Sequence, residues 1–186
     1  MRKNHYFAGQ NCFFMDQKIL TSKQYFKLLL LVYGVMLVAQ VGTGTVFFFL
    51  RSTQSKSMPN EVTLGQLFGY LVPCAAVILP LVGILLAKKT IKALRINDLL
   101  SDKLRKYQSA LIFKYAFFEG ATFFSLVAYF ITGELLHLGV AGALVMVFLT
   151  QLPTRNRVFN EVPLSTLDES KLNNPDAEVA AIPVKD

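Results

Sequence analysis

The sequence predicts an all-α integral membrane protein, with four transmembrane helices in an antiparallel bundle. Composition is the first observation: 53% of the 186 residues are hydrophobic and only 17% are charged, whereas a soluble domain carries roughly 25% charged residues. Distribution is the second, because the apolar residues form long runs that short charged stretches separate. Together they exclude a disordered chain, a secreted disulfide scaffold and most soluble folds.

Four apolar runs justify the four helices. A bilayer core about 30 Å thick needs roughly 20 apolar residues in a helix, and the runs cover residues 28–50, 67–87, 110–132 and 135–152. Each run should be helical, because the backbone must satisfy its own hydrogen bonds in lipid. The runs divide the chain into an N-terminal segment (1–27), a four-helix transmembrane domain (28–152) and a tail (153–186).

The segments outside the runs carry weaker signals. The first run leads directly into Arg51 without a small-residue cleavage site, so we interpret it as a span and not as a signal peptide. Either Met1 or Met15 can be the true start. The second helix is expected to continue to about Ile96, with Ser101 capping the next helix. The tail is rich in proline and acids and poor in aromatics, which predicts a mostly disordered segment.

The basic residues predict the orientation. Five lysines and arginines precede the first run, seven lie between the second and third runs, and none lies between the third and fourth. Since such residues accumulate on the cytoplasmic side, both termini and the middle loop should be cytoplasmic, in a bacterial inner (plasma) membrane. The net charge of +7 therefore reflects topology, and we expect no nucleic acid partner.

Glu119 is the main candidate for chemistry. It lies about 13 Å from Ala110 along the third helix, near the bilayer midplane, where a charge is costly unless it is paired, neutralised or hydrated. Gln40 is the other deep polar residue and is expected to meet Glu119 across a helix interface. Glu119 is either a proton- or cation-binding carboxylate, or a neutral acid hydrogen-bonded to Gln40, Tyr115 or a backbone carbonyl. Lys114 should extend its amine to the cytoplasmic surface.

Small residues in the spans predict close helix contacts, because they let neighbouring backbones approach. The candidates for helix packing are Gly42, Gly44, Ala116, Gly120, Gly139 and Ala143. Pro73 and Pro80 invite a kink in the second helix, which packing against neighbours can accommodate.

The sequence predicts neither an enzyme nor a cofactor. It lacks a nucleophile elbow, a phosphate-binding loop, a zinc-protease pair and a dinucleotide fingerprint. His5 and His137 stand alone, as expected of surface or interfacial histidines, so no metal site is predicted. Cys12 and Cys74 are not expected to form a disulfide.

The stretch from Tyr115 to Ala121, followed by Tyr129 and Thr132-Gly133, resembles part of one span in small, uncharacterised bacterial four-helix membrane proteins. A mid-membrane carboxylate is also similar to the proteolipid ring subunits of rotary ATPases and to small multidrug exporters. The chain departs from both patterns, because it lacks the glycine-repeat helix and Arg-Gln-Pro loop of ring subunits. Its acid also belongs to the third span, whereas the exporters place theirs in the first.

These observations favour a non-enzymatic, multi-pass membrane protein of structural or interaction type. The expected partners are membrane lipids, together with further copies of the chain or another membrane protein. The alternative is a proton- or cation-coupled carrier or ring subunit that uses Glu119, with Gln40 as its polar neighbour.

Overall fold

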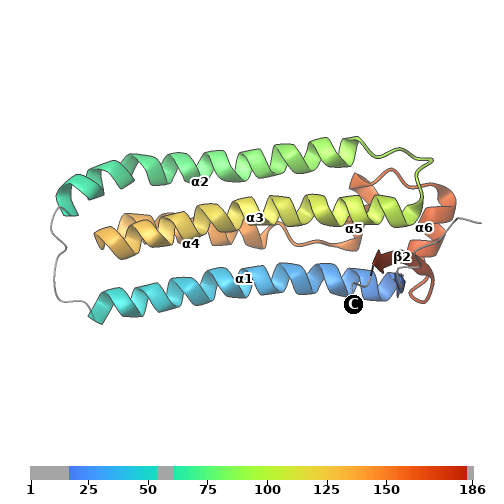
Figure 1. Ribbon diagram of the computed structural model, residues 1–186, viewed down its shortest axis with the longest axis horizontal. Helices are drawn as coiled ribbons and strands as arrows, with labels where there is room; N and C mark the ends of the chain where they lie inside the picture. The colour runs from blue at the N-terminus through green and yellow to red at the C-terminus, as the bar shows by residue number, and fades with distance from the viewer. Residues whose placement is uncertain (1–16, 54–60, 184–186) are drawn as a thin grey trace, which may run out of the picture.

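The computed structural model describes residues 17–53 and 61–183, and it is all-helical apart from one two-stranded sheet (Figure 1). The all-α class is thus confirmed for the described residues. The elements are β1 (Gln17–Thr21), α1 (Ser22–Thr53), α2 (Glu61–Lys92), α3 (Leu100–Thr132), α4 (Leu135–Leu149), α5 (Arg155–Glu161), α6 (Thr166–Asn173) and β2 (Glu178–Pro183).

Three helices, α1, α2 and α3, are long and apolar enough to cross a membrane. Each extends beyond its apolar run, so hydropathy alone does not mark where it begins and ends. Thr21 and Gln24 form a reciprocal pair, in which each side chain accepts a hydrogen bond from the other residue's backbone N–H. This capping-box arrangement begins α1 at Ser22, ahead of the apolar run that starts at residue 28.

The fourth apolar run forms a shorter helix than expected. The 15 residues of α4 correspond to about 22 Å, and the helix ends at Leu149, before the predicted boundary at 152. Thr150 and Gln151 instead close a turn on the carbonyls of Val147 and Phe148. Pro153 follows, and a residue before proline is disfavoured in helical conformation.

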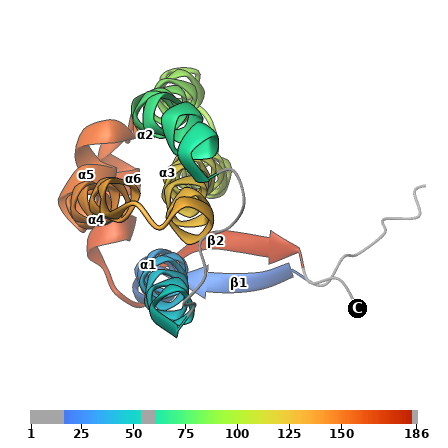
Figure 2. The ribbon, with the colours of Figure 1, turned by 90° about the vertical axis from the view of Figure 1, so that its left-hand side faces the viewer.

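The four helices α1 to α4 lie side by side, and α3 contacts each of the other three (Figures 1 and 2). Gly133 ends α3 in the left-handed conformation, with φ of 74°, which glycine adopts without a steric penalty. Only Gly133 and Glu134 separate α3 from α4. Large apolar side chains remain exposed on α1 from Leu30 to Leu50 and on α2 from Leu67 to Leu86.

The region between α2 and α3 differs from the sequence prediction. The second helix ends at Lys92, four residues before Ile96. Residue 99 is the N-cap of α3, without a side-chain cap hydrogen bond, so the expected cap at Ser101 is wrong. Ser101 lies already inside the first turn, so its hydroxyl does not hold the N-cap position from which a side chain accepts a first-turn N–H. The helix α2 continues unbroken through Pro73 and Pro80.

The tail is ordered, and the prediction that residues 153–186 are mostly disordered is wrong for the described part. Thr154 caps α5 by accepting a hydrogen bond from the Arg157 backbone N–H, and Ser165 and Asp168 form a capping box at the start of α6. The strand β2 then pairs antiparallel with β1, from Gln17 opposite Pro183 to Thr21 opposite Glu178. Composition alone misses this outcome, since the tail gains its apolar contacts from other segments.

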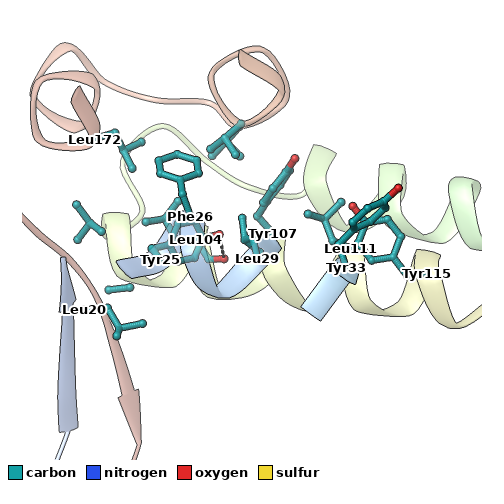
Figure 3. Close-up of a cluster of buried hydrophobic side chains, with 14 of the residues drawn as sticks. Leu20, Tyr25, Phe26, Leu29, Tyr33, Leu104, Tyr107, Leu111, Tyr115 and Leu172 are labelled. Atoms are coloured by element: carbon teal, nitrogen blue, oxygen red, sulfur yellow. Dashed lines mark hydrogen bonds between the residues drawn. The ribbon is translucent and has the colours of Figure 1, made fainter. Parts of the chain in front are cut away.

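The largest buried cluster lies at the end of the helices where the tail docks, and we call it the end core (Figure 3). Its members come from β1, α1, α3, the tail and neighbouring helix ends. Aromatic rings dominate its centre, with Tyr33 stacked on Phe148 and edge-on to Tyr115. The cluster comprises Leu20, Tyr25, Phe26, Leu29, Tyr33, Leu94, Leu104, Tyr107, Leu111, Tyr115, Phe118, Phe148, Val158, Val162, Leu172, Val179 and Ala180.

Candidate functional site

Gln40 is buried between α1 and α3, but its partner is not the one expected. Its side chain is only 1% exposed. The Thr122 hydroxyl lies 3.3 Å from Gln40 Oε1 and 3.0 Å from the carbonyl of Phe118, and shares its proton between them. No residue that the structure describes accepts a hydrogen bond from Gln40 Nε2. The structure therefore joins Gln40 to Thr122, three positions beyond Glu119 on α3.

Glu119 is half-buried on α3. The residues expected to bind it are engaged elsewhere: Gln40 contacts Thr122, and the Tyr115 hydroxyl donates to the carbonyl of Gln151 over 2.9 Å. Within residues 17–53 and 61–183 no hydrogen bond or ion pair reaches the Glu119 carboxyl. The two polar residues of the predicted site are neighbours along the α1–α3 interface without being partners.

Among the predicted packing residues, only Gly44 lies against another helix, where a Cβ would meet Leu126 at 3.5 Å. The other five are exposed on the helix surfaces: Gly42, Ala116, Gly120, Gly139 and Ala143. A close approach between α2 and α3 occurs instead at Gly83 on α2, a residue that the sequence analysis missed. A Cβ there would lie 2.7 Å from Phe117 Cβ and 3.2 Å from the carbonyl of Lys114.

A buried ion pair fastens the tail to the helices. Lys103 in the first turn of α3 has a fully buried side chain, and its Nζ donates to Asp168 Oδ2 over 2.8 Å and to the carbonyl of Ile96 over 2.7 Å. Burial of Asp168 alone would raise its pKa, but hydrogen bonds from Lys103 and Ser165 outweigh burial and hold that pKa below its ordinary value of 3.8. The pattern Ser165-x-x-Asp168 is a recognisable capping box, although its reach to Lys103 is not local information.

Further hydrogen bonds tie the same end together. Tyr25 donates to the carbonyl of Leu104 over 2.9 Å, and Ser22 donates to the carbonyl of Leu172 over 2.7 Å. Tyr107 donates to Glu161 Oε2 over 3.1 Å. Each bond joins a long helix to a segment distant in sequence, so the end is one packed unit.

A pocket of about 490 Å³ opens beside the end core, between α2, α3 and α5. Its lining combines apolar and basic side chains: Ile84, Ala87, Lys88, Ile91, Lys92, Leu111, Lys114, Gln151, Arg157 and Glu161.

Lys114 is the deepest cation in this pocket, and its predicted extension to the surface is wrong. The residue is 8% exposed. Its Nζ lies 3.3 Å from Gln151 Oε1 and 5.3 Å from the centre of the Tyr115 ring. The amine therefore stays among protein groups, with the side chain of Gln151 as its hydrogen-bond partner.

The opposite end of the helices contains a second polar group. His137 is fully buried in the first turn of α4, packed edge-on near Phe68, with its Nε2 3.5 Å from Glu134 Oε2. A surface position for this histidine is thus wrong. Arg51 lies against Gly133 and Glu134 lies against Gly65, so this cluster joins α1, α2, α3 and α4.

The described residues contain no group of three or more His, Cys, Asp or Glu side chains arranged to hold a metal ion. Cys74 is exposed, while His5 and Cys12 lie outside the described residues. Comparisons with protein-family models, curated proteins and solved structures gave no match.

Proposed function

We propose that the protein is a non-enzymatic, multi-pass protein of a bacterial inner membrane, of structural or interaction type. In this proposal α1 to α4 form an antiparallel four-span bundle, and both termini lie in the cytoplasm with the docked tail. The observation that carries the proposal is the pairing of exposed apolar helix surfaces with a folded polar end built from the tail. Such an arrangement suits a membrane anchor that presents a rigid cytoplasmic surface.

The lengths of the helices along the bundle axis support four crossings of the membrane. The exposed apolar residues of α1, from Leu30 to Leu50, cover about 30 Å, the thickness of a bilayer core. On α3, Tyr115 and Gly133 are separated by about 27 Å. The segment from Gly133 through α4 to Gln151 covers the same interval, because α4 begins directly after the α3–α4 turn and Gln151, beyond its end, binds Tyr115.

Thiol mapping tests the topology. In a chain with Cys12 and Cys74 replaced by alanine, we expect single cysteines at Ser52 and Glu134 to react with an impermeant maleimide added outside cells. Cysteines at Arg95 and Glu169 should react only after the membrane is opened. Reaction of all four positions from the same side would refute the four-span arrangement.

Two exposed leucines support an interaction role for the cytoplasmic end. Leu99 and Leu167 are 71% and 73% exposed, and the contact of Lys103 with Asp168 and Ile96 brings their segments together. A photo-crosslinking residue at Leu167 should capture one discrete membrane protein, and the same residue at Lys171 on α6 should not. Identical adducts from both positions, or none from either, would contradict a specific partner surface.

We also propose that copies of the chain associate. The five exposed small residues on α1, α3 and α4 are suited to close helix contacts between copies, since lipid gives helices no hydrophobic reason to associate and packing decides. Disulfide cross-linking of Gly120→Cys and Gly139→Cys should trap dimers, and Val127→Cys, an exposed position outside this set, should not.

The alternative is a proton- or cation-coupled carrier or ring subunit that uses Glu119. One observation favours it: Gln40 Nε2 is buried and no described residue accepts a hydrogen bond from it, and Gln40 contacts Thr122, three positions beyond Glu119 on α3. A carrier requires carbodiimide labelling of Glu119 that changes with pH and is blocked by sodium or a substrate. The packing role requires instead that Glu119→Gln alter only thermal stability, with no effect on proton flux in vesicles.

A further inference from the structure

We propose that the basic pocket between α2, α3 and α5 binds the phosphate of an anionic phospholipid headgroup. The inference rests on the proposed membrane placement, which sets the pocket at the cytoplasmic surface of the bilayer. It adds a specific lipid site to a protein that otherwise would contact lipid only through its apolar helix faces.

The pocket lining changes from apolar to basic along α2, as the acyl chain and phosphate of a phospholipid require. Ile84 lies within the exposed apolar stretch of α2 that ends at Leu86, and Ala87 follows it directly, so both belong to the membrane side of the α2 wall. Lys88 and Lys92 follow four residues apart, on one face of the same helix. An acyl chain can therefore continue along the apolar surface of α2 while its phosphate enters among the cations.

The protein neutralises the cations in the pocket only in part, because they outnumber its acids. Four cations line it (Lys88, Lys92, Lys114 and Arg157) against the single carboxylate of Glu161. None of the four forms a salt bridge within the described part of the chain, and the Glu161 carboxylate accepts a hydrogen bond from Tyr107.

Lys114 makes the need for an anion most evident. A buried charge is costly unless it is paired, yet its hydrogen-bond partner is the neutral amide of Gln151. Arg157 is held at the pocket by donating to the carbonyl of Thr150 over 2.9 Å. A phosphate between these groups supplies the missing negative charge and accepts several hydrogen bonds, which is how basic pockets between membrane helices hold anionic headgroups.

The volume favours a lipid headgroup over a free anion. Ligand pockets of about 300–1,000 Å³ suit drug-sized groups, and this pocket of about 490 Å³ exceeds what an inorganic phosphate fills. Its apolar wall of Ile84, Ile91 and Leu111 has no role in binding a free anion, whereas it suits the glycerol and first acyl methylenes of a phospholipid.

Native mass spectrometry of the full chain, released from nanodiscs, tests the site. In discs of phosphatidylcholine with phosphatidylglycerol, we expect the wild-type protein to retain phosphatidylglycerol. The variant Lys88→Gln/Lys92→Gln should bind it about thirty-fold more weakly, since each surface cation contributes about a factor of five. The matched control is Lys89→Gln/Arg95→Gln, which removes two exposed cations that do not line the pocket and should retain the lipid.

Three outcomes would overturn the proposal. Equal loss of lipid in the control variant means that general surface charge explains the binding. No retained phosphatidylglycerol in the wild-type protein means that the pocket is not a lipid site. Equally tight binding of soluble glycerol phosphate in phosphatidylcholine discs assigns the site to a soluble phosphate compound. Lys114→Met tests the buried cation in the same assay, and each variant is first checked for its melting temperature.

Failure of this inference is distinguishable from failure of the proposed function. Thiol mapping reports the topology without reference to any lipid, so a four-span result can stand beside an empty pocket. If the mapping instead placed Arg95 outside, the pocket would face the other leaflet and the membrane placement itself would be refuted.

Discussion

Lys103 shows how a residue can carry two roles that the sequence presents as one. Counted as a loop cation, it contributes to the prediction of a cytoplasmic middle loop. In the structure its side chain has no exposed surface and binds Asp168 and the carbonyl of Ile96. It therefore connects the start of α3 to the start of α6, and the topological signal is also a structural link.

Removing the acid from this pair should be costly. Asp168→Asn leaves the Lys103 ammonium buried without its counter-charge, and breaking a buried pair in this way costs about 3–5 kcal/mol. Lys103→Met should cost less, because Asp168 retains 14% side-chain exposure and keeps its hydrogen bond from Ser165. Chemical unfolding followed by circular dichroism measures both losses. The exposed pair Arg105–Asp102 is the control, and Arg105→Gln should change stability by less than about 1 kcal/mol.

The lowered pKa of Asp168 predicts acid sensitivity of tail docking. Since the folded-state pKa lies below the ordinary value of 3.8, the carboxylate stabilises the docked tail at every pH above that value. This contribution is lost as the pH falls below 3.8 through the folded pKa. Limited digestion of the tail with pepsin, at pH values from 4.5 downward, should accelerate across this window. The acceleration should exceed that of Asp168→Asn, which follows the pH dependence of pepsin itself, and a wild-type rate that parallels the variant's at every pH would contradict the assignment.

At the scale of a residue, the sequence singles out Glu119 and Gln40 as polar positions within apolar runs, but it does not give their contacts. Counting along a helix gives depth, whereas the direction of a side chain depends on how neighbouring helices rotate. Gln40 meets Thr122 because α1 and α3 pack with those two positions facing each other. No periodicity in one helix contains that information.

At the scale of an element, Gly83 is the tightest contact between α2 and α3. Gly83→Ala should destabilise the protein by about 1–3 kcal/mol, because the added Cβ would lie 2.7 Å from Phe117 Cβ and the helices would have to move apart. Gly69→Ala on the same helix is the matched control, since nothing lies within 4 Å of a Cβ there. It should be neutral or stabilising by up to about 1 kcal/mol. Thermal unfolding in detergent compares them, and equal effects would contradict the close contact.

The existence of the long helices was predictable, and their ends were only partly so. Hydropathy indicates where a segment is apolar, and it located the bodies of α1, α2 and α3. Caps determine where a helix starts, and the pair Thr21-x-x-Gln24 extends α1 beyond its apolar run. The pattern of small residues was less informative about contacts within the chain. Small residues permit close helix contacts, but the pattern does not show whether the neighbouring helix belongs to the same chain.

At the scale of the whole molecule, the tail completes the packed end. Val158, Val162, Leu172 and Val179 are each at most 4% exposed within the end core, and burying such a side chain contributes about 1.5–3 kcal/mol. Truncation after Leu152 should therefore lower stability by several kcal/mol and expose Tyr25 and Tyr107. The melting temperature of the purified protein measures the effect. Deletion of residues 184–186 is the control, and an unchanged melting temperature in the longer truncation would contradict the docking.

The order of the tail could not be predicted from composition, and the reason is physical. A short segment with few aromatics cannot bury enough surface by itself to offset its conformational entropy. Here the missing apolar surface comes from Phe26, Leu29 and Leu104 on other helices. Disorder rules consider a segment in isolation, so they fail where distant parts of the chain supply its core.

The pairing of β1 with β2 has a consequence for biosynthesis. One strand precedes all four apolar runs and its partner follows them, so the sheet cannot form until the last run has left the ribosome. Residues 17–21 therefore remain unpaired while the four apolar runs are synthesised. Pairing of β1 with β2 is thus a late event. A finished protein has this sheet, and a chain whose synthesis has stalled before β2 lacks it.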